Sequence, residues 1–139
     1  MKLSEIKEIM KRTEEWREVV ECIILRVPDI HVDDGRFVNS DRIDTVMCDD
    51  LESDLYILGC FNSNFLADVL NIDEDVIVAM QQAEAFEAIG KLVISLGKLD
   101  DLQEQAVRWD GYGHHFNHYD GTEDEVYFDE YPMYYFFRN

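Results

Sequence analysis

Three of the four histidines in this 139-residue chain lie in one twelve-residue segment, from Asp110 to Gly121. Imidazole and carboxylate groups together are good ligands for zinc, iron or manganese. A metal-dependent enzyme built on this segment is therefore one hypothesis for the function. The side chains that would take part are His114, His115 and His118, with Asp110, Asp120 and Glu123 beside them.

The spacing of these histidines opposes that hypothesis. Two Asp-Gly steps, Asp110-Gly111 and Asp120-Gly121, are typical of hairpin turns and predict an extended rather than a helical segment. On an extended strand His114 and His118 share a face about 13 Å apart, because each residue advances the chain by about 3.3 Å. His115 then points to the opposite face. We therefore expect no metal ion and no other cofactor at this segment.

The cysteines Cys22, Cys48 and Cys60 are the other candidates for chemistry. An odd number of widely separated cysteines, with no Cys-x-x-Cys pair, fits buried thiols in a reduced cytoplasm better than a disulfide framework. A cysteine could pair with a distant histidine, but no nucleophile elbow, zinc-protease helix or glycine-rich phosphate loop is present in the sequence. A secretory signal pattern and a membrane-length apolar run are also lacking. The sequence therefore predicts a cytoplasmic protein that is not an enzyme.

Acidic residues outnumber basic residues by 31 to 12, which gives a formal net charge of −19. From Ile43 to Gly90 there are eleven acids and no Lys or Arg, and from Trp109 to Phe137 there are seven acids and no base. A field of one sign repels nucleic acid and lipid headgroups and attracts basic protein surfaces. We therefore predict a basic protein partner, with no direct binding of nucleic acid or membrane. The alternative is that the acids only keep the protein soluble.

Closely spaced carboxylates also resemble a phosphate backbone, because DNA carries about one negative charge per 1.7 Å of helix axis. A protein of this kind could occupy the nucleic-acid channel of a nuclease and so act as a DNA mimic. Its carboxylates would pair with Arg and Lys and speed association at low salt. The predicted partner-binding residues are Asp49, Asp50, Glu52, Asp54, Asp73, Glu74, Asp75, Glu123, Asp124 and Glu125.

The hydrophobic pattern predicts the elements that position these acids. With 47% hydrophobic residues the chain should fold, and its length fits a single domain, residues 1–139. Apolar residues at helical spacing predict a first helix from Leu3 to Val27, with Ser4 as its N-cap and Pro28 as its stop. Residues 74–96 are apolar on most faces, which predicts a helix buried in the domain centre or in a homodimer.

Shorter elements are predicted between these helices. Asp33-Asp34-Gly35 predicts a turn, followed by a short strand or an irregular connection. Residues 51–60 and 65–70 predict two short helices, and Asp73 is the predicted N-cap of the long helix. Gly90 within the long helix would allow another element to approach closely.

The last third of the chain changes character. A short helix is predicted over residues 99–108, and two β-rich runs, 126–128 and 133–137, predict a small antiparallel meander. Residues 1–108 are thus expected to be mainly helical and residues 109–139 to be rich in strands. Helices followed by segregated antiparallel strands give an α+β fold, here mostly helical with a buried central helix and a small C-terminal meander.

The tail also carries the following residues: Asp110-Gly111-Tyr112-Gly113-His114, Tyr119-Asp120-Gly121, Glu123, Glu125, Tyr134-Tyr135, Arg138 and Asn139. This pattern resembles the C-terminal signature of small proteins encoded in bacteriophage and prophage genomes. The resemblance implies a mobile-element origin, where small acidic proteins often inhibit restriction or CRISPR nucleases. It therefore implies an anti-restriction or anti-CRISPR inhibitor in the cytoplasm of a bacterial host. A phage accessory or assembly protein is the alternative.

Overall fold

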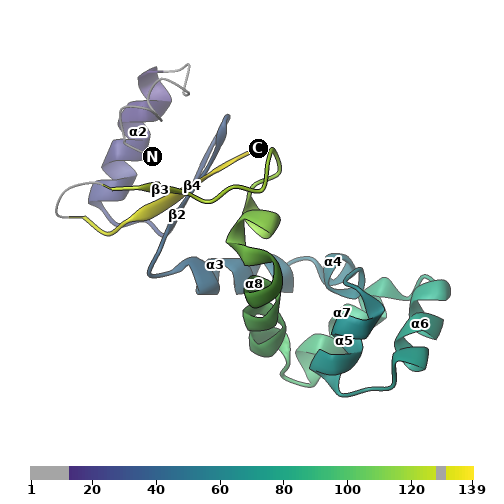
Figure 1. The fold of residues 1–139 in the computed structure, drawn as a ribbon. Coiled ribbons are helices and arrows are strands. Elements are labelled where there is room, and N and C mark those ends of the chain that lie inside the picture. Colours follow the sequence, from purple (N-terminus) through teal and green to yellow (C-terminus); the bar gives the residue numbers. More distant parts are fainter. Residues whose placement is uncertain (1–12, 128–130) are drawn as a thin grey trace. The chain divides into compact units, whose positions relative to one another are not determined.

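The structure is a computed structural model that describes residues 13–127 and 131–139. It divides into two compact units (Figure 1). The sheet unit comprises Met1–Val46 and Asp110–Asn139, and the helical unit comprises Met47–Trp109. The single domain expected from the sequence stays a prediction. The predicted N-cap Ser4 lies outside the described residues.

The described residues form seven helices and four strands. The helices are α2 (Thr13–Ile24), α3 (Ile43–Glu52), α4 (Leu55–Gly59), α5 (Ser63–Leu70), α6 (Glu74–Gln82), α7 (Phe86–Ser95) and α8 (Leu99–Phe116). The strands are β1 (Asp29–Val32), β2 (Gly35–Asn39), β3 (Asp124–Val126) and β4 (Tyr134–Arg138). The predicted α+β fold, mostly helical, is confirmed.

The strands form one antiparallel sheet in the order β1-β2-β4-β3. Asp33-Asp34 connects β1 to β2 as a hairpin, which confirms the predicted turn. β2 then pairs with β4, which places Phe37 opposite Phe136. The predicted C-terminal meander therefore supplies two of the four strands, and the other two come from residues 29–39.

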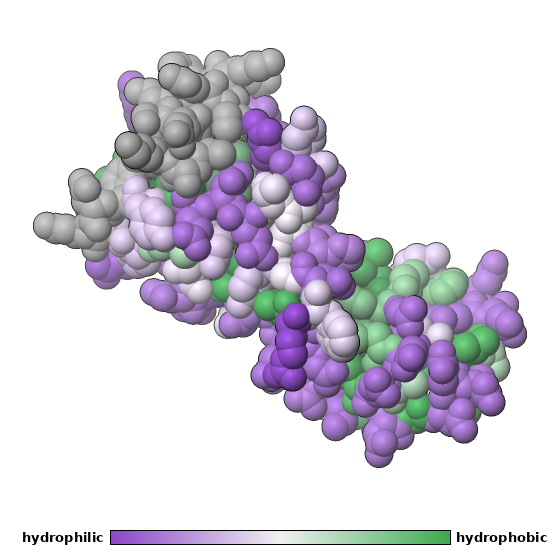
Figure 2. Space-filling view, in the orientation of Figure 1, coloured by the Kyte–Doolittle hydropathy of each residue, from purple (hydrophilic) through white to green (hydrophobic). Residues whose placement is uncertain are grey.

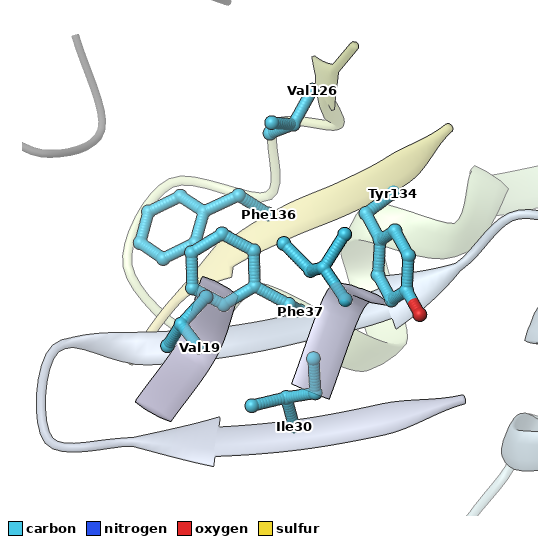
Figure 3. Packing of buried hydrophobic residues seen from close by; sticks show 7 residues of the cluster. Val19, Ile30, Phe37, Val126, Tyr134 and Phe136 are labelled. Atoms are coloured by element: carbon cyan, nitrogen blue, oxygen red, sulfur yellow. The ribbon is translucent and has the colours of Figure 1, made fainter. Parts of the chain in front are cut away.

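One face of the sheet packs against α2 and forms the core of the sheet unit (Figure 3). Successive strand residues point to opposite faces, so alternate residues such as Tyr134 and Phe136 of β4 reach this core. The hydroxyl of Tyr134 donates a hydrogen bond to the carbonyl of Val27 at 2.7 Å, which satisfies a buried polar group. The buried residues of this core are Val19, Ile23, Ile30, Phe37, Val126, Tyr134 and Phe136.

In the helical unit, α4 and α7 pack backbone against backbone at two glycines. A Cβ atom on Gly59 would collide with the backbone carbonyl of Phe86, and a Cβ on Gly90 would collide with that of Leu55. Glycine permits this approach because it has no side chain. The close approach predicted at Gly90 is confirmed. In α4, Leu58 is buried whereas Ile57 is exposed.

The prediction of one continuous helix over residues 74–96 is wrong, because α6 and α7 are separate helices. Glu84 lies between them with a φ of 59°, a left-handed conformation that an α-helix does not contain. Ile77 of α6 and Ile89 and Val93 of α7 are all buried. Because the apolar pattern continues across the break and no Gly or Pro marks it, periodicity alone could not locate it.

Candidate functional site

The histidine-rich segment begins inside α8. Gly111 has a φ of 74° and divides this helix into two helical parts. The carboxylate of Glu123 accepts hydrogen bonds from the backbone N–H groups of Tyr112 and Gly113. It therefore caps the second helical part, whose first N–H groups have no partner within the helix. The hairpin turn predicted at Asp110-Gly111 is wrong, because Glu123 stabilises a new helical turn after the glycine.

Asn117 organises the loop that follows α8. Its side-chain oxygen accepts hydrogen bonds from the N–H groups of Tyr119 and Asp120, both at 3.0 Å. Its amide nitrogen donates to the carbonyl of Thr122 at 2.9 Å. The N–H of Thr122 in turn donates to the carboxylate of Asp120, and this bond holds the pKa of Asp120 below its ordinary value. The polar residues of this segment therefore stabilise a loop.

The three histidines of the segment do not converge. His114 and His118 are exposed, and His115 is half-buried with its ring edge-on to Phe116 at a centroid distance of 4.5 Å. Among residues 13–127 and 131–139, no three His, Cys, Asp or Glu side chains are placed to hold one metal ion. The expected strand through His114 and His118 is wrong, because His114 lies in α8 and His118 lies in the following turn.

The cysteines form no disulfide with one another. Cys22 and Cys48 are half-buried and Cys60 is exposed, so the expectation of buried thiols is wrong for Cys60. The thiol of Cys48 lies 3.7 Å from a carboxylate oxygen of Asp100. A carboxylate neighbour does not promote the thiolate form that nucleophilic chemistry requires.

The second face of the sheet carries a row of aromatic rings. Phe116 at the end of α8 stacks on Phe137, with 4.9 Å between the ring centroids. Tyr135 lies 5.8 Å from Phe137 and 6.0 Å from Tyr112. The guanidinium of Arg36 lies over Phe116, 4.9 Å from the ring centroid, in a cation–π contact. This row attaches the second part of α8 to the sheet.

Carboxylates surround the tyrosine end of this row. The hydroxyl of Tyr112 donates a hydrogen bond to Asp44 at 2.7 Å. Burial, and then this hydrogen bond, raises the pKa of Tyr112 well above its ordinary value. Burial, and then the charge of Glu125, raises the pKa of Tyr135. Both hydroxyls therefore stay protonated at neutral pH, and that of Tyr112 serves as a structural hydrogen-bond donor.

We expect the protein to lose stability as the pH rises above about 10, the ordinary pKa of tyrosine. Below that pH the native and unfolded states both keep the Tyr112 proton, so its stabilising contribution is complete. Above it the unfolded chain loses the proton while the native state, with its raised pKa, keeps it. Deprotonation then favours the unfolded state, and the contribution is lost as the pH climbs toward the native pKa.

Urea unfolding at several pH values between about 8 and 11 checks this expectation. The stability difference between the wild type and Tyr112→Phe should be constant below pH 10 and should shrink above it. Asp44→Asn keeps a hydrogen-bond acceptor but removes the charge, so its own stability should fall less over the same pH interval. A wild-type-to-Tyr112→Phe difference that stays constant throughout would contradict the assignment.

Seven of the ten predicted partner-binding acids lie in the helical unit. At the end of α3 and the start of α4, Asp49, Glu52 and Asp54 are exposed and Asp50 is half-buried. We call these four residues the α3–α4 acid group. Asp54 is also the N-cap of α4, because its carboxylate accepts the N–H of Ile57 at 3.2 Å. One member of the group therefore has a structural role as well.

Asp73, Glu74 and Asp75 form a second set, which we call the α6 acid group. All three are exposed. Asp73 accepts the N–H of Asp75 at 3.0 Å, which confirms the predicted N-cap of α6. Glu74 accepts the hydroxyl of Ser63 at 3.0 Å. Negative charge at this helix end meets the positive end of the helix dipole, so the fold holds the carboxylates in place while they face solvent.

The remaining three predicted acids lie in the sheet unit. Glu123 caps the second part of α8, and Glu125 accepts a hydrogen bond from the hydroxyl of Tyr127. Asp124 is half-buried in β3, at the position paired with Phe136. The structure therefore places the predicted contact residues in three groups, two in the helical unit and one in the sheet unit.

The helical unit has a large excess of negative charge, with thirteen Asp and Glu against three Lys and Arg. Lys98 lies 3.7 Å from Asp101, and Arg108 lies 3.3 Å from Glu104. Exposed pairs of this kind contribute about 0–1 kcal/mol each. Since three bases cannot balance thirteen acids, the surface of this unit is negative whatever the pairing. Hydrophilic residues cover much of the face seen in Figure 2.

Sequence reasoning missed the structural roles of Glu123 and Asn117. Glu123 was predicted as a partner contact, yet it binds backbone N–H groups eleven and ten residues earlier. A contact over that separation leaves no local signal. Asn117 could have been found, because Asn readily accepts hydrogen bonds from N–H groups two or three residues later in a turn.

Comparison of the chain with protein families, with characterised proteins and with solved structures found no match. Within the part of the chain that the structure describes, no helix has the length and apolar character needed to cross a bilayer.

Proposed function

We propose that this chain is a non-enzymatic inhibitor, encoded by a bacteriophage or prophage, that binds a basic surface of a host defence nuclease complex. It works in the bacterial cytoplasm and acts stoichiometrically. By presenting carboxylates to a surface that otherwise grips DNA or RNA, it competes with nucleic acid as a mimic. The observation that carries the proposal is the charge of the helical unit, which contains thirteen Asp and Glu residues but only three Lys and Arg residues.

The two acid groups of the helical unit support this mode of binding. The α6 acid group is exposed and the α3–α4 acid group is largely so, and both lie at helix ends whose backbone is held by the caps Asp54 and Asp73. Carboxylates held on an ordered backbone lose less conformational freedom when they bind Arg or Lys. Charge-assisted hydrogen bonds of this kind are shorter and stronger than neutral ones.

The complex should weaken strongly with salt. Raising the ionic strength from about 0.05 M to about 0.5 M shortens the Debye length and screens attraction between exposed charges. The partner is first isolated by co-purification with the tagged protein from infected host cells, and its affinity is then measured across this salt range. Affinity that does not change with salt, or recovery of virion proteins in place of a nuclease, would count against the proposal.

A sharper test neutralises the α6 acid group with Asp73→Asn, Glu74→Gln and Asp75→Asn together. We expect affinity for the isolated partner to fall about tenfold or more. The fold should persist, because Asn is as good an N-cap as Asp. The binding isotherm of this variant and its thermal unfolding curve are measured side by side.

The matched control removes three charges elsewhere in the same unit, through Asp100→Asn, Asp101→Asn and Glu104→Gln in α8. Two of these acids pair with Lys98 and Arg108. We therefore expect a smaller loss of affinity than in the α6 variant. Equal losses would show that net charge alone matters, and no loss in either variant would contradict the proposed function.

A further inference from the structure

Helix α4 presents two adjacent apolar side chains to solvent. Tyr56 is 51% exposed and Ile57 is 46% exposed. The ring of Tyr56 meets that of Phe86 edge-on, with 5.1 Å between centroids, so its orientation is supported by α7. Figure 2 shows apolar surface interleaved with hydrophilic surface over the helical unit. Single exposed apolar residues are ordinary, so only the surroundings of this pair distinguish it.

Two acids, Asp54 and Glu52, precede the pair in the sequence. The Asp54 carboxylate accepts the N–H of Ile57 itself, which places a negative charge next to the apolar pair. Glu52 is exposed and comes two residues before Asp54. Glu52 and Leu55 also line an open groove of about 350 Å³, together with Lys91.

Protein interfaces combine an aromatic or apolar anchor with a charged rim, and the anchor contributes most of the affinity. The charges beside this pair, those of Asp54 and Glu52, are negative. A complementary partner surface therefore carries an apolar side chain flanked by Arg or Lys. Acidic charge alone would attract any basic surface. An apolar pair beside these acids adds discrimination in favour of partners that carry an apolar residue next to their basic ones.

Resting on the proposed function, we propose that Tyr56 and Ile57 are the anchor at which the partner docks. The docking segment of the partner is basic and places an apolar side chain on this pair, while its Arg or Lys side chains face Asp54 and Glu52. The charge of the unit then governs the rate of encounter, and the anchor governs which basic protein stays bound.

The test uses two synthetic peptides of equal length and equal Arg content as probes. In one the arginines are separated by Gly and Ser, and in the other Leu replaces two of the Gly or Ser residues. Binding of each peptide to the full chain is measured by fluorescence anisotropy. We expect the Leu peptide to bind about tenfold more tightly, and Tyr56→Ala and Ile57→Ala each to remove most of this difference. Affinity for the Gly-Ser peptide should stay within twofold.

The matched control is Leu96→Ala, because Leu96 is 48% exposed but lies two residues before Lys98 and outside the acid groups. It should change neither affinity. Ile57→Ala keeps the test decisive if loss of the Tyr56–Phe86 contact unfolds the Tyr56 variant. Equal binding of both peptides, or a Leu preference that survives both substitutions, overturns the anchor. If neither peptide binds, the proposed function itself fails.

Discussion

Gly90→Ala should lower the free energy of unfolding of the helical unit by about 2 kcal/mol. A methyl group at this position would overlap the backbone carbonyl of Leu55, which cannot move unless the whole of α4 moves. Overpacking of this kind costs about 3 kcal/mol, and the better helix propensity of alanine returns about 1 kcal/mol. Gly59→Ala should act in the same direction through Phe86.

The control for this prediction is Ala88→Gly, an exposed position two residues earlier in the same helix. It reports helix propensity without packing, and should destabilise by about 1 kcal/mol. Urea unfolding followed by circular dichroism compares the variants. Because both glycines serve one crossing, the Gly59→Ala and Gly90→Ala double variant should lose less than the sum of the single losses. Stabilisation by Gly90→Ala would show that α4 and α7 do not approach so closely.

The elements that the sequence predicted well are those whose signals are local. Asp73 precedes an apolar segment, and it is the N-cap of α6 in the structure. A cap depends on a side chain and on N–H groups two or three residues later, so a short stretch of sequence contains the whole interaction. The turn at Asp33-Asp34 has the same property.

The sheet could be predicted only in part, because its pairing is not local. β2 and β4 are neighbours although Phe37 and Phe136 lie far apart in the sequence. Each strand pattern shows that one face is apolar, but it does not show which other strand will cover its edge. The tail was therefore expected to form a separate meander, whereas β4 adds to the hairpin formed by β1 and β2.

The candidate site shows the same limit. The excess of acids is evident in the sequence, and composition alone predicts a basic partner. Which acids share a unit depends on the fold: Glu52 and Asp73 lie in the helical unit, whereas Glu123 lies in the sheet unit and binds backbone N–H groups. The exposure of Tyr56 and Ile57 could not be predicted either. A helix of five residues is too short for the spacing of its apolar residues to define which face is buried.

Asn117→Ala should destabilise the sheet unit by about 2 kcal/mol. Asn117 is 4% exposed, and its side chain makes hydrogen bonds to three backbone groups of the loop that leads toward β3. Each such bond contributes about 1 kcal/mol net, and water that reaches the exposed loop replaces part of the loss. Denaturant unfolding of the variant measures the effect.

The neighbouring histidine provides the control that decides between a loop scaffold and a chemical site. His118→Ala should change stability by no more than about 0.5 kcal/mol, because this side chain is exposed. Asn117→Asp keeps the two acceptor bonds to Tyr119 and Asp120 and loses the donor bond to Thr122, so its stability should lie between those of the wild type and Asn117→Ala.

If His118→Ala abolished inhibition of the partner while Asn117→Ala left both stability and inhibition intact, the segment would act through its imidazoles. The opposite pattern, a large loss at Asn117 and none at His118, follows from a segment whose polar residues are committed to holding the backbone.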